Sequence, residues 1–311
     1  MSSALDETTG NSYQHPRDPV EIWLARQWQD VLGFGIGIRE NFFGVGGNSL
    51  DAARVIDAVL VEFGIQLPLN VLSECPTVEQ LATLLRGHAG RLSGPLVVIQ
   101  DGDGGRPPLF VVHPGSGQVG LYCRLAHVLG EEYPVSGLQA AGLYSDAEPC
   151  RTVAAMAAGY ADAVRAVCPA GPYLLGGSGI GAAVAWEMAA ALGDVQLVAV
   201  IGEELLEPGD AVTGSWVRQP PAPGDLPGIL AGWQERGLVP PDAAPEFAAR
   251  SLRVWQASRD AVRGWQPSSY TGPVDVFGQV PAGIVPAAAA QRVHPCSTDE
   301  QLASALRELL G

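Results

Sequence analysis

The chain has 311 residues, of which 47% are hydrophobic and 16% are charged, and its net charge at pH 7 is −15. This length and composition can bury the core of one large domain and of a second, small one. The strong negative charge argues against partners such as nucleic acids or anionic membrane surfaces, and no apolar run approaches the roughly 20 residues that cross a bilayer. The five cysteines show no C-x-x-C pairing, so we expect a cytoplasmic protein with no disulfide framework and no metal site.

The N-terminal quarter divides into a polar segment and a helical one. Residues 1–18 are polar and acidic and contain Gly10 and Pro16, which predicts a disordered leader without a secretory signal. From 19 to 88, apolar residues recur at helical spacing, first over 20–32 and then over 51–63. A last helix is predicted to begin after Thr77, which can serve as its N-cap.

The segment Asn41-Phe-Phe-Gly-Val-Gly-Gly-Asn-Ser-Leu50 stands before the second of these helices. A serine at a helix N-terminus lies at the positive end of the helix dipole, where a phosphodiester is well placed. Alternatively Ser49 only caps its helix, but capping would not require the adjacent Phe42-Phe43 pair and the glycine pair.

Residues 19–88 resemble a peptidyl carrier protein, which is a small four-helix bundle, and the resemblance covers the whole segment. It implies that Ser49 carries covalent 4′-phosphopantetheine, attached by a phosphopantetheinyl transferase.

After a short linker at 89–94, residues 95–311 alternate predicted strands and helices. Unbroken apolar runs, typical of buried strands, lie at 108–113, 195–201 and 274–277, and helices are expected at 153–167 and 298–310. This alternation predicts a mostly parallel α/β sheet, whose functional groups gather at the carboxyl ends of the strands.

The segment Pro172-Tyr-Leu-Leu-Gly-Gly-Ser-Gly-Ile-Gly-Ala182 reads as a strand, a tight turn and a helix, the pattern of an α/β-hydrolase nucleophile elbow. It is similar to the thioesterase domains that end nonribosomal peptide and polyketide synthetases. Those domains typically have Gly-x-Ser-x-Gly and then a helix with Tyr-Glu-Met-Ala. Alignment on Tyr173 and on Trp186-Glu-Met-Ala189 places Gly179 at the nucleophile position.

Ser178 is the alternative nucleophile, but in that register Ile180 would stand where the second motif glycine is needed. A glycine cannot attack an acyl group, so covalent catalysis by the usual route is not available. Two explanations stay open here: the family chemistry has been lost or rerouted, or Gly179 replaces a Ser or Cys that was present originally.

The resemblance also implies an oxyanion hole made by the backbone N–H groups of Gly115 and Ile180. Gly115 belongs to the turn that follows His113, and backbone donors survive side-chain substitution. We expect His113 itself to be structural, because the catalytic base of the family lies elsewhere.

The remaining catalytic positions follow later strands. The family's triad aspartate ends the strand at 195–201, where this chain has Gly202 followed by Glu203. Glu203 could orient a histidine, or it could simply be solvated, and no acid occurs over 278–283. His294, which we expect after the last strand and before the last helix, matches the family's catalytic histidine. We expect Cys296 to be an inert thiol rather than a relocated nucleophile.

Together these resemblances imply a carrier–thioesterase didomain of nonribosomal peptide biosynthesis, with a lid inserted at about 207–265. It would hold an aminoacyl or peptidyl group as a thioester and release it by hydrolysis or cyclisation, in concert with other synthetase domains or tailoring enzymes. Gly179 leaves enzymatic activity in doubt. The alternatives are a non-catalytic module that presents the carried group to enzymes acting in trans, and direct hydrolysis in which His294, with or without Glu203, activates water.

Overall fold

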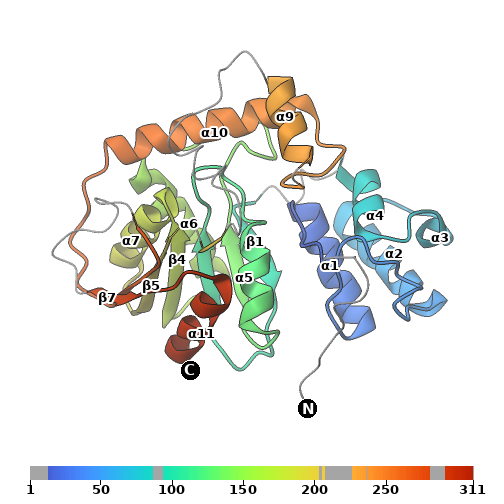
Figure 1. Ribbon diagram of the computed structural model, residues 1–311, viewed down its shortest axis with the longest axis horizontal. Helices are drawn as coiled ribbons and strands as arrows, with labels where there is room; N and C mark the ends of the chain where they lie inside the picture. The colour runs from blue at the N-terminus through green and yellow to red at the C-terminus, as the bar shows by residue number, and fades with distance from the viewer. Residues whose placement is uncertain are drawn as a thin grey trace.

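The computed structural model describes residues 13–86, 94–202, 205–206, 226–235, 237–280 and 291–310. They form a helical N-terminal domain and a larger α/β domain (Figure 1). The described part of the chain contains no helix that is both long and apolar enough to span a membrane.

The helical domain contains α1 (Pro19–Leu32), α2 (Ser49–Phe63), the short α3 (Val71–Glu74) and α4 (Val78–Leu85). Polar side chains cap three of these helices: Asp18 caps α1, Asn48 caps α2 and Thr77 caps α4, as predicted for Thr77. Trp28 and Phe42 are fully buried at the centre, with their ring centroids 4.9 Å apart. The apolar faces of the helices thus close one small core, as the helical spacing predicts.

The α/β domain is built on a seven-stranded sheet in the order β1-β3-β2-β4-β5-β6-β7. Only β1 runs antiparallel to its neighbour, and the other pairs are parallel. The strands are β1 (Leu96–Gln100), β2 (Leu109–Val112), β3 (Val135–Leu138), β4 (Tyr173–Ser178), β5 (Val195–Ile201), β6 (Val274–Phe277) and β7 (Gln291–His294). This mixed α/β architecture confirms the predicted fold class.

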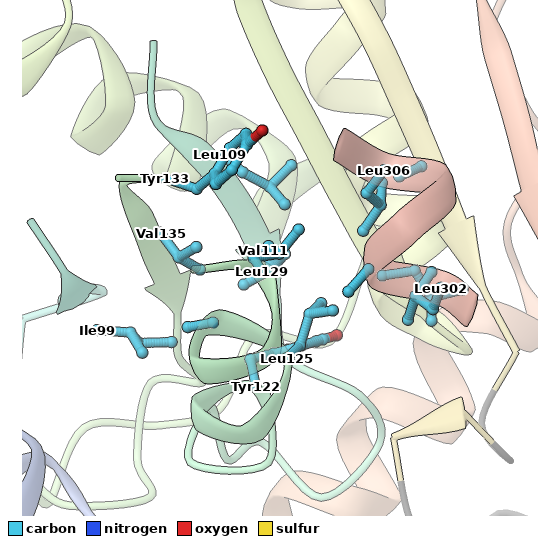
Figure 2. Close-up of a cluster of buried hydrophobic side chains, with 14 of the residues drawn as sticks. Ile99, Leu109, Val111, Tyr122, Leu125, Leu129, Tyr133, Val135, Leu302 and Leu306 are labelled. Atoms are coloured by element: carbon cyan, nitrogen blue, oxygen red, sulfur yellow. The ribbon is translucent and has the colours of Figure 1, made fainter. Parts of the chain in front are cut away.

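Helices cover both faces of the sheet. One face packs against α5 (Tyr122–Leu129) and α11 (Asp299–Leu310), whose leucines meet the side chains of β1, β2 and β3 (Figure 2). The other face packs against α6 (Val153–Val167) and α7 (Ile180–Leu192). Both cores are apolar and continuous with the sheet, so the strand ends are held in fixed positions.

The insertion between β5 and β6 contains α9 (Leu226–Glu235) and α10 (Pro245–Arg263). Val254 of α10 packs with Ala140 and Leu143, which follow β3, so α10 lies over the carboxyl ends of the central strands. This is where the sequence predicts a lid; residues 207–225 of that prediction lie outside the described residues.

Part of the predicted leader is ordered against the rest of the protein. The ring of Tyr13 stacks on His127 of α5 with centroids 4.6 Å apart, and Arg17 is buried and pairs with Glu79 at 2.8 Å. Residues 13–17 therefore do not form a disordered leader, because aromatic and ionic contacts fix them. Residues 1–12 of that prediction, and all but Gly94 of the predicted linker, lie outside the described residues.

Candidate functional site

The turn between β4 and α7 consists of Gly179 alone. The strand ends at Ser178 and the helix begins at Ile180, and Gly179 has φ 56° and ψ −123°. Side chains with a Cβ rarely adopt this region of backbone space. The strained corner typical of a nucleophile elbow therefore falls on Gly179 and not on Ser178.

The two glycines on either side of this corner are required by close packing. A Cβ on Gly177 would lie 2.4 Å from the carbonyl carbon of Gly181, and a Cβ on Gly181 would lie 2.5 Å from the carbonyl oxygen of Val112. Gly177 and Gly181 thus occupy positions at which the helix approaches β4 and β2 most closely. This spacing favours the alignment that puts Gly179 at the nucleophile position.

Ser178 points into the sheet instead of above it. Its side chain is fully buried, and its hydroxyl has no hydrogen-bond partner among the described residues. In the sheet, Ser178 pairs with Ile201, Ile201 with Phe277, and Phe277 with His294. Two strands therefore separate the Ser178 hydroxyl from the imidazole that would have to activate it.

Two backbone N–H groups face the corner from neighbouring strands. Val112 of β2 pairs with Gly177 of β4, so Gly115 and Ile180 each lie three residues beyond a paired position at the same edge of the sheet. Ile180 is the first residue of α7 and so has no acceptor within its own helix. Within the described residues neither N–H donates a hydrogen bond, which leaves both able to bind a carbonyl oxygen.

His294 is the last residue of β7, so it does not follow the strand as expected. Its Nε2 lies 2.7 Å from Oδ1 of Asp275, and its ring stacks on Phe277 with centroids 4.7 Å apart. Its backbone is three inter-strand spacings, or about 14 Å, from the end of β4. The structure therefore does not bring His294 and Gly179 together in this conformation.

Asp275 is the acidic partner that our sequence analysis missed. It is fully buried in β6, and its second oxygen accepts a hydrogen bond of 2.8 Å from Arg292. We searched for an acid after the strands, where triad residues lie, whereas Asp275 is inside a strand. The available signal was a carboxylate within an otherwise apolar buried run, which is rare unless the charge is paired.

His113 has the structural place that we expected. Its ring is buried, with Nδ1 2.7 Å from the carbonyl oxygen of Pro114 and Nε2 2.8 Å from the hydroxyl of Tyr160. A carbonyl oxygen can only accept, so Nδ1 carries the proton and Nε2 of the neutral ring accepts from Tyr160. Burial lowers the pKa of His113 to about 4, and the backbone hydrogen bond to Pro114 opposes this shift.

Two other candidates add nothing to the site. Burial raises the pKa of the Cys296 thiol, which makes this group less nucleophilic at neutral pH. Glu203, the candidate acid after β5, lies outside the described residues.

Ser49 is the first residue of α2, and its side chain is exposed. Asn48 caps the helix, because its side-chain oxygen accepts from the backbone N–H groups of Leu50 at 2.8 Å and Asp51 at 3.1 Å. Capping therefore does not occupy Ser49, contrary to the alternative interpretation. Its free hydroxyl at the positive end of a helix fits a phosphodiester-linked group such as phosphopantetheine.

A glycine of the motif before Ser49 also has a packing reason. A Cβ on Gly47 would lie 2.5 Å from the ring of Phe42, which fills the centre of the helical core. The aromatic and glycine residues of this motif thus shape the loop that presents Ser49.

Two protein families match the chain, one on each domain. The family described as "Phosphopantetheine attachment site" matches residues 23–85, and the family described as "Thioesterase domain" matches residues 107–200. The first match indicates a covalent 4′-phosphopantetheine cofactor.

Among similar curated proteins, "Malpinin synthetase" of Mortierella alpina is 37% identical over 183 residues, which are 58% of this chain and 2% of that protein. The "Dimodular nonribosomal peptide synthase" of Bacillus subtilis is 36% identical over 178 residues, or 57% of this chain and 8% of that protein. The chain thus spans a small part of the length of these relatives.

A solved structure described as holo-AB3403, a four-domain nonribosomal peptide synthetase bound to AMP and glycine, shares the fold. It aligns with 98% of this chain and 27% of its own, with a TM-score of 0.75 and 22% sequence identity. Helical and α/β domains of this kind therefore occur together, in one polypeptide, in that protein as well.

Proposed function

Because the chain belongs to the carrier–thioesterase didomains of nonribosomal peptide synthetases, we propose that it holds an aminoacyl or peptidyl thioester on Ser49 and releases it by hydrolysis or cyclisation. When attached, phosphopantetheine supplies the thiol that carries the acyl group. The observation that carries this proposal is the pair of unengaged N–H groups, of Gly115 and Ile180, at a corner that has no side chain.

In this proposal the thioester carbonyl lies above Gly179 and its oxygen accepts hydrogen bonds from the N–H groups of Gly115 and Ile180. These donors stabilise the negative charge that develops when water, or an amine or hydroxyl of the substrate, attacks the acyl carbon. The carbon–sulfur bond breaks, and the proton lost by the attacking group goes to the departing sulfur. No acyl-enzyme forms, because neither residue 178 nor residue 179 offers an attacking atom.

We propose His294 as the base that takes the proton from the attacking group. Asp275 accepts from Nε2, so Nδ1 is the basic atom of the neutral ring. The ring lies over Phe277 and must leave it to reach the thioester. We therefore expect a contribution of about 10-fold, below the 10²–10⁴-fold of a base already in place. Removal of triad members in a serine protease leaves a rate about 10³–10⁴ above that in water, so slow release is the expected activity.

The partners proposed for this site are a phosphopantetheinyl transferase, which would act on Ser49, and the synthetase domains or tailoring enzymes that supply the acyl group. The comparisons do not favour a purely non-catalytic holding module.

To test the proposal, Ser49 is loaded with an acyl-pantetheine from acyl-coenzyme A, and the loss of the acyl mass is followed by intact-protein mass spectrometry. We expect loss faster than from the same thioester on the isolated carrier segment, and a rate about 10-fold lower after His294→Ala. Ser49→Ala, the loading control, should take up no pantetheine. Equal loss from the whole chain and from the isolated carrier segment would contradict a releasing function.

A further inference from the structure

Helix α1 has two buried faces. One face contributes Val20, Leu24 and Trp28 to the core of the helical domain. On the opposite face, Ile22 is 2% exposed and belongs to the core of the α/β domain, together with Val97, Ile99, Cys123 and Ala126. The two domains therefore share an apolar contact through α1, which a loosely tethered carrier would lack.

Polar contacts close the rim of this interface. Arg26 of α1 forms a bidentate pair with Asp101, with Nε at 2.9 Å and Nη2 at 2.6 Å from its oxygens. The stack of Tyr13 on His127 lies along the same boundary. Both partners in the α/β domain, Asp101 and His127, lie at or next to β1 and α5.

A second contact joins the carrier to the lid. Arg86, at the end of α4, donates to Asp18 at 2.8 Å and to Glu21 at 2.6 Å, and its remaining nitrogen donates to Asp242. Asp242 lies between α9 and α10, whereas Asp18 and Glu21 are buried in the carrier. One guanidinium thus holds the lid and the docked carrier together.

The serine to be loaded lies on the other side of the carrier. Helix α2 packs on α1 and has no comparable contact with the α/β domain, and α1 lies between α2 and the sheet (Figure 1). Beside Ser49, Leu50 is 63% exposed. Helix α1 and the strands β1, β3 and β2 separate this surface from β4 and Gly179.

We propose that this docked arrangement is a resting state in which Ser49 is presented outward for loading, and that the carrier must leave the α1 interface before its thioester reaches Gly179. The Arg26–Asp101 and Arg86–Asp242 pairs hold that state, and breaking the second pair also releases the lid. The delivery half of this proposal rests on the proposed function, while the docked state itself does not.

The test uses the whole chain with Asp101→Arg and Asp242→Arg combined, which replaces two attractive pairs with two repulsive ones. Asp146→Arg is the matched control, because Asp146 pairs with Arg250 of the lid at 2.6 Å but does not contact the carrier. Adding Arg26→Asp to Asp101→Arg should restore the first pair with its charges exchanged.

Three rates are compared. Amide hydrogen exchange in β1 and α5 should rise about threefold for each broken pair, as expected for partly exposed ion pairs. Loading of Ser49 by a phosphopantetheinyl transferase should stay within twofold, because Ser49 is already accessible. Loss of the acyl group should rise at least threefold in the double variant, and Asp146→Arg should leave all three rates unchanged.

Unchanged exchange in the double variant, or loading that becomes much faster, would overturn the docked resting state. Slower loss of the acyl group would show that the docked arrangement is the one that delivers, and would also overturn the proposal. If no variant loses its acyl group faster than the isolated carrier, the proposed function fails, and exchange and loading still decide the resting state.

Discussion

At the residue scale, the site is defined by which side chain stands at the corner after β4. The backbone of Gly179 has φ 56°, and the crowding at Gly177 and Gly181 leaves one register for the motif. Spacing alone already favoured this register, because glycines at close approaches can be recognised from sequence. The place of His294 could not be predicted, because it depends on a hydrogen bond to Asp275 in a neighbouring strand.

Substitutions at the start of α2 separate capping from attachment. Asn48→Ala should lower the free energy of unfolding of the carrier by about 1 kcal/mol, because it removes an acceptor for two backbone N–H groups. Ser49→Ala should change it by less than about 0.5 kcal/mol while abolishing pantetheine loading. Urea denaturation and intact mass measure the two effects, and a Ser49→Ala protein as unstable as Asn48→Ala would assign the capping role to the wrong residue.

Buried His113 predicts a pH dependence of stability. Its pKa in the folded protein is about 4, below the ordinary value of about 6.5, so the unfolded chain binds the proton more readily. The stabilisation is complete above about pH 6.5 and is lost as the pH falls toward 4, at up to about 1.4 kcal/mol per pH unit.

His113→Phe should be less stable than the natural chain at pH 7.5, because the bonds to Pro114 and Tyr160 are lost. Between pH 6.5 and 5 its free energy of unfolding should fall less steeply. Urea denaturation at several pH values measures both slopes, and parallel slopes would contradict a neutral, buried His113.

At the element scale, helices and strands with an unambiguous apolar pattern were predictable to the residue. The bounds of α6, β5 and β6 coincide with the expected ranges 153–167, 195–201 and 274–277. Residues 13–17 were mispredicted because a polar, proline-containing segment carries no periodic signal, and its order comes from contacts with α5 and α4. Asp275 was missed for the related reason that its role comes from β7, which is distant in sequence.

The contact of α7 with β4 and β2 predicts a sharp difference between two helical glycines. Gly181→Ala would bring a Cβ within 2.5 Å of the Val112 carbonyl oxygen, so we expect a loss of about 2 kcal/mol or more. Gly159→Ala in α6 meets nothing within 4 Å and should stabilise the protein by about 0.5–1 kcal/mol. Thermal unfolding compares the pair, and similar melting temperatures would contradict the close approach at the elbow.

At the scale of the whole molecule, α1 joins two domains that the sequence presents as separate units. The apolar pattern of α1 predicted a helix, but it did not reveal that Ile22 and Trp28 face different cores. Interdomain pairs such as Arg26–Asp101 are also invisible in sequence, because their partners lie far apart in the chain. The family and fold were therefore predictable, whereas the relation between carrier, lid and site required the structure.

The central claim is that no side chain at the β4–α7 corner accepts the acyl group in this chain. It is tested most directly by loading Ser49 with an acyl-pantetheine and mapping the acyl mass on peptides that contain residues 178 and 179. We predict no acylated residue there in the natural chain, and slow acylation of position 179 in Gly179→Ser, where the N–H groups of Gly115 and Ile180 stabilise the attack. An acyl group found on Ser178 of the natural chain would contradict the account.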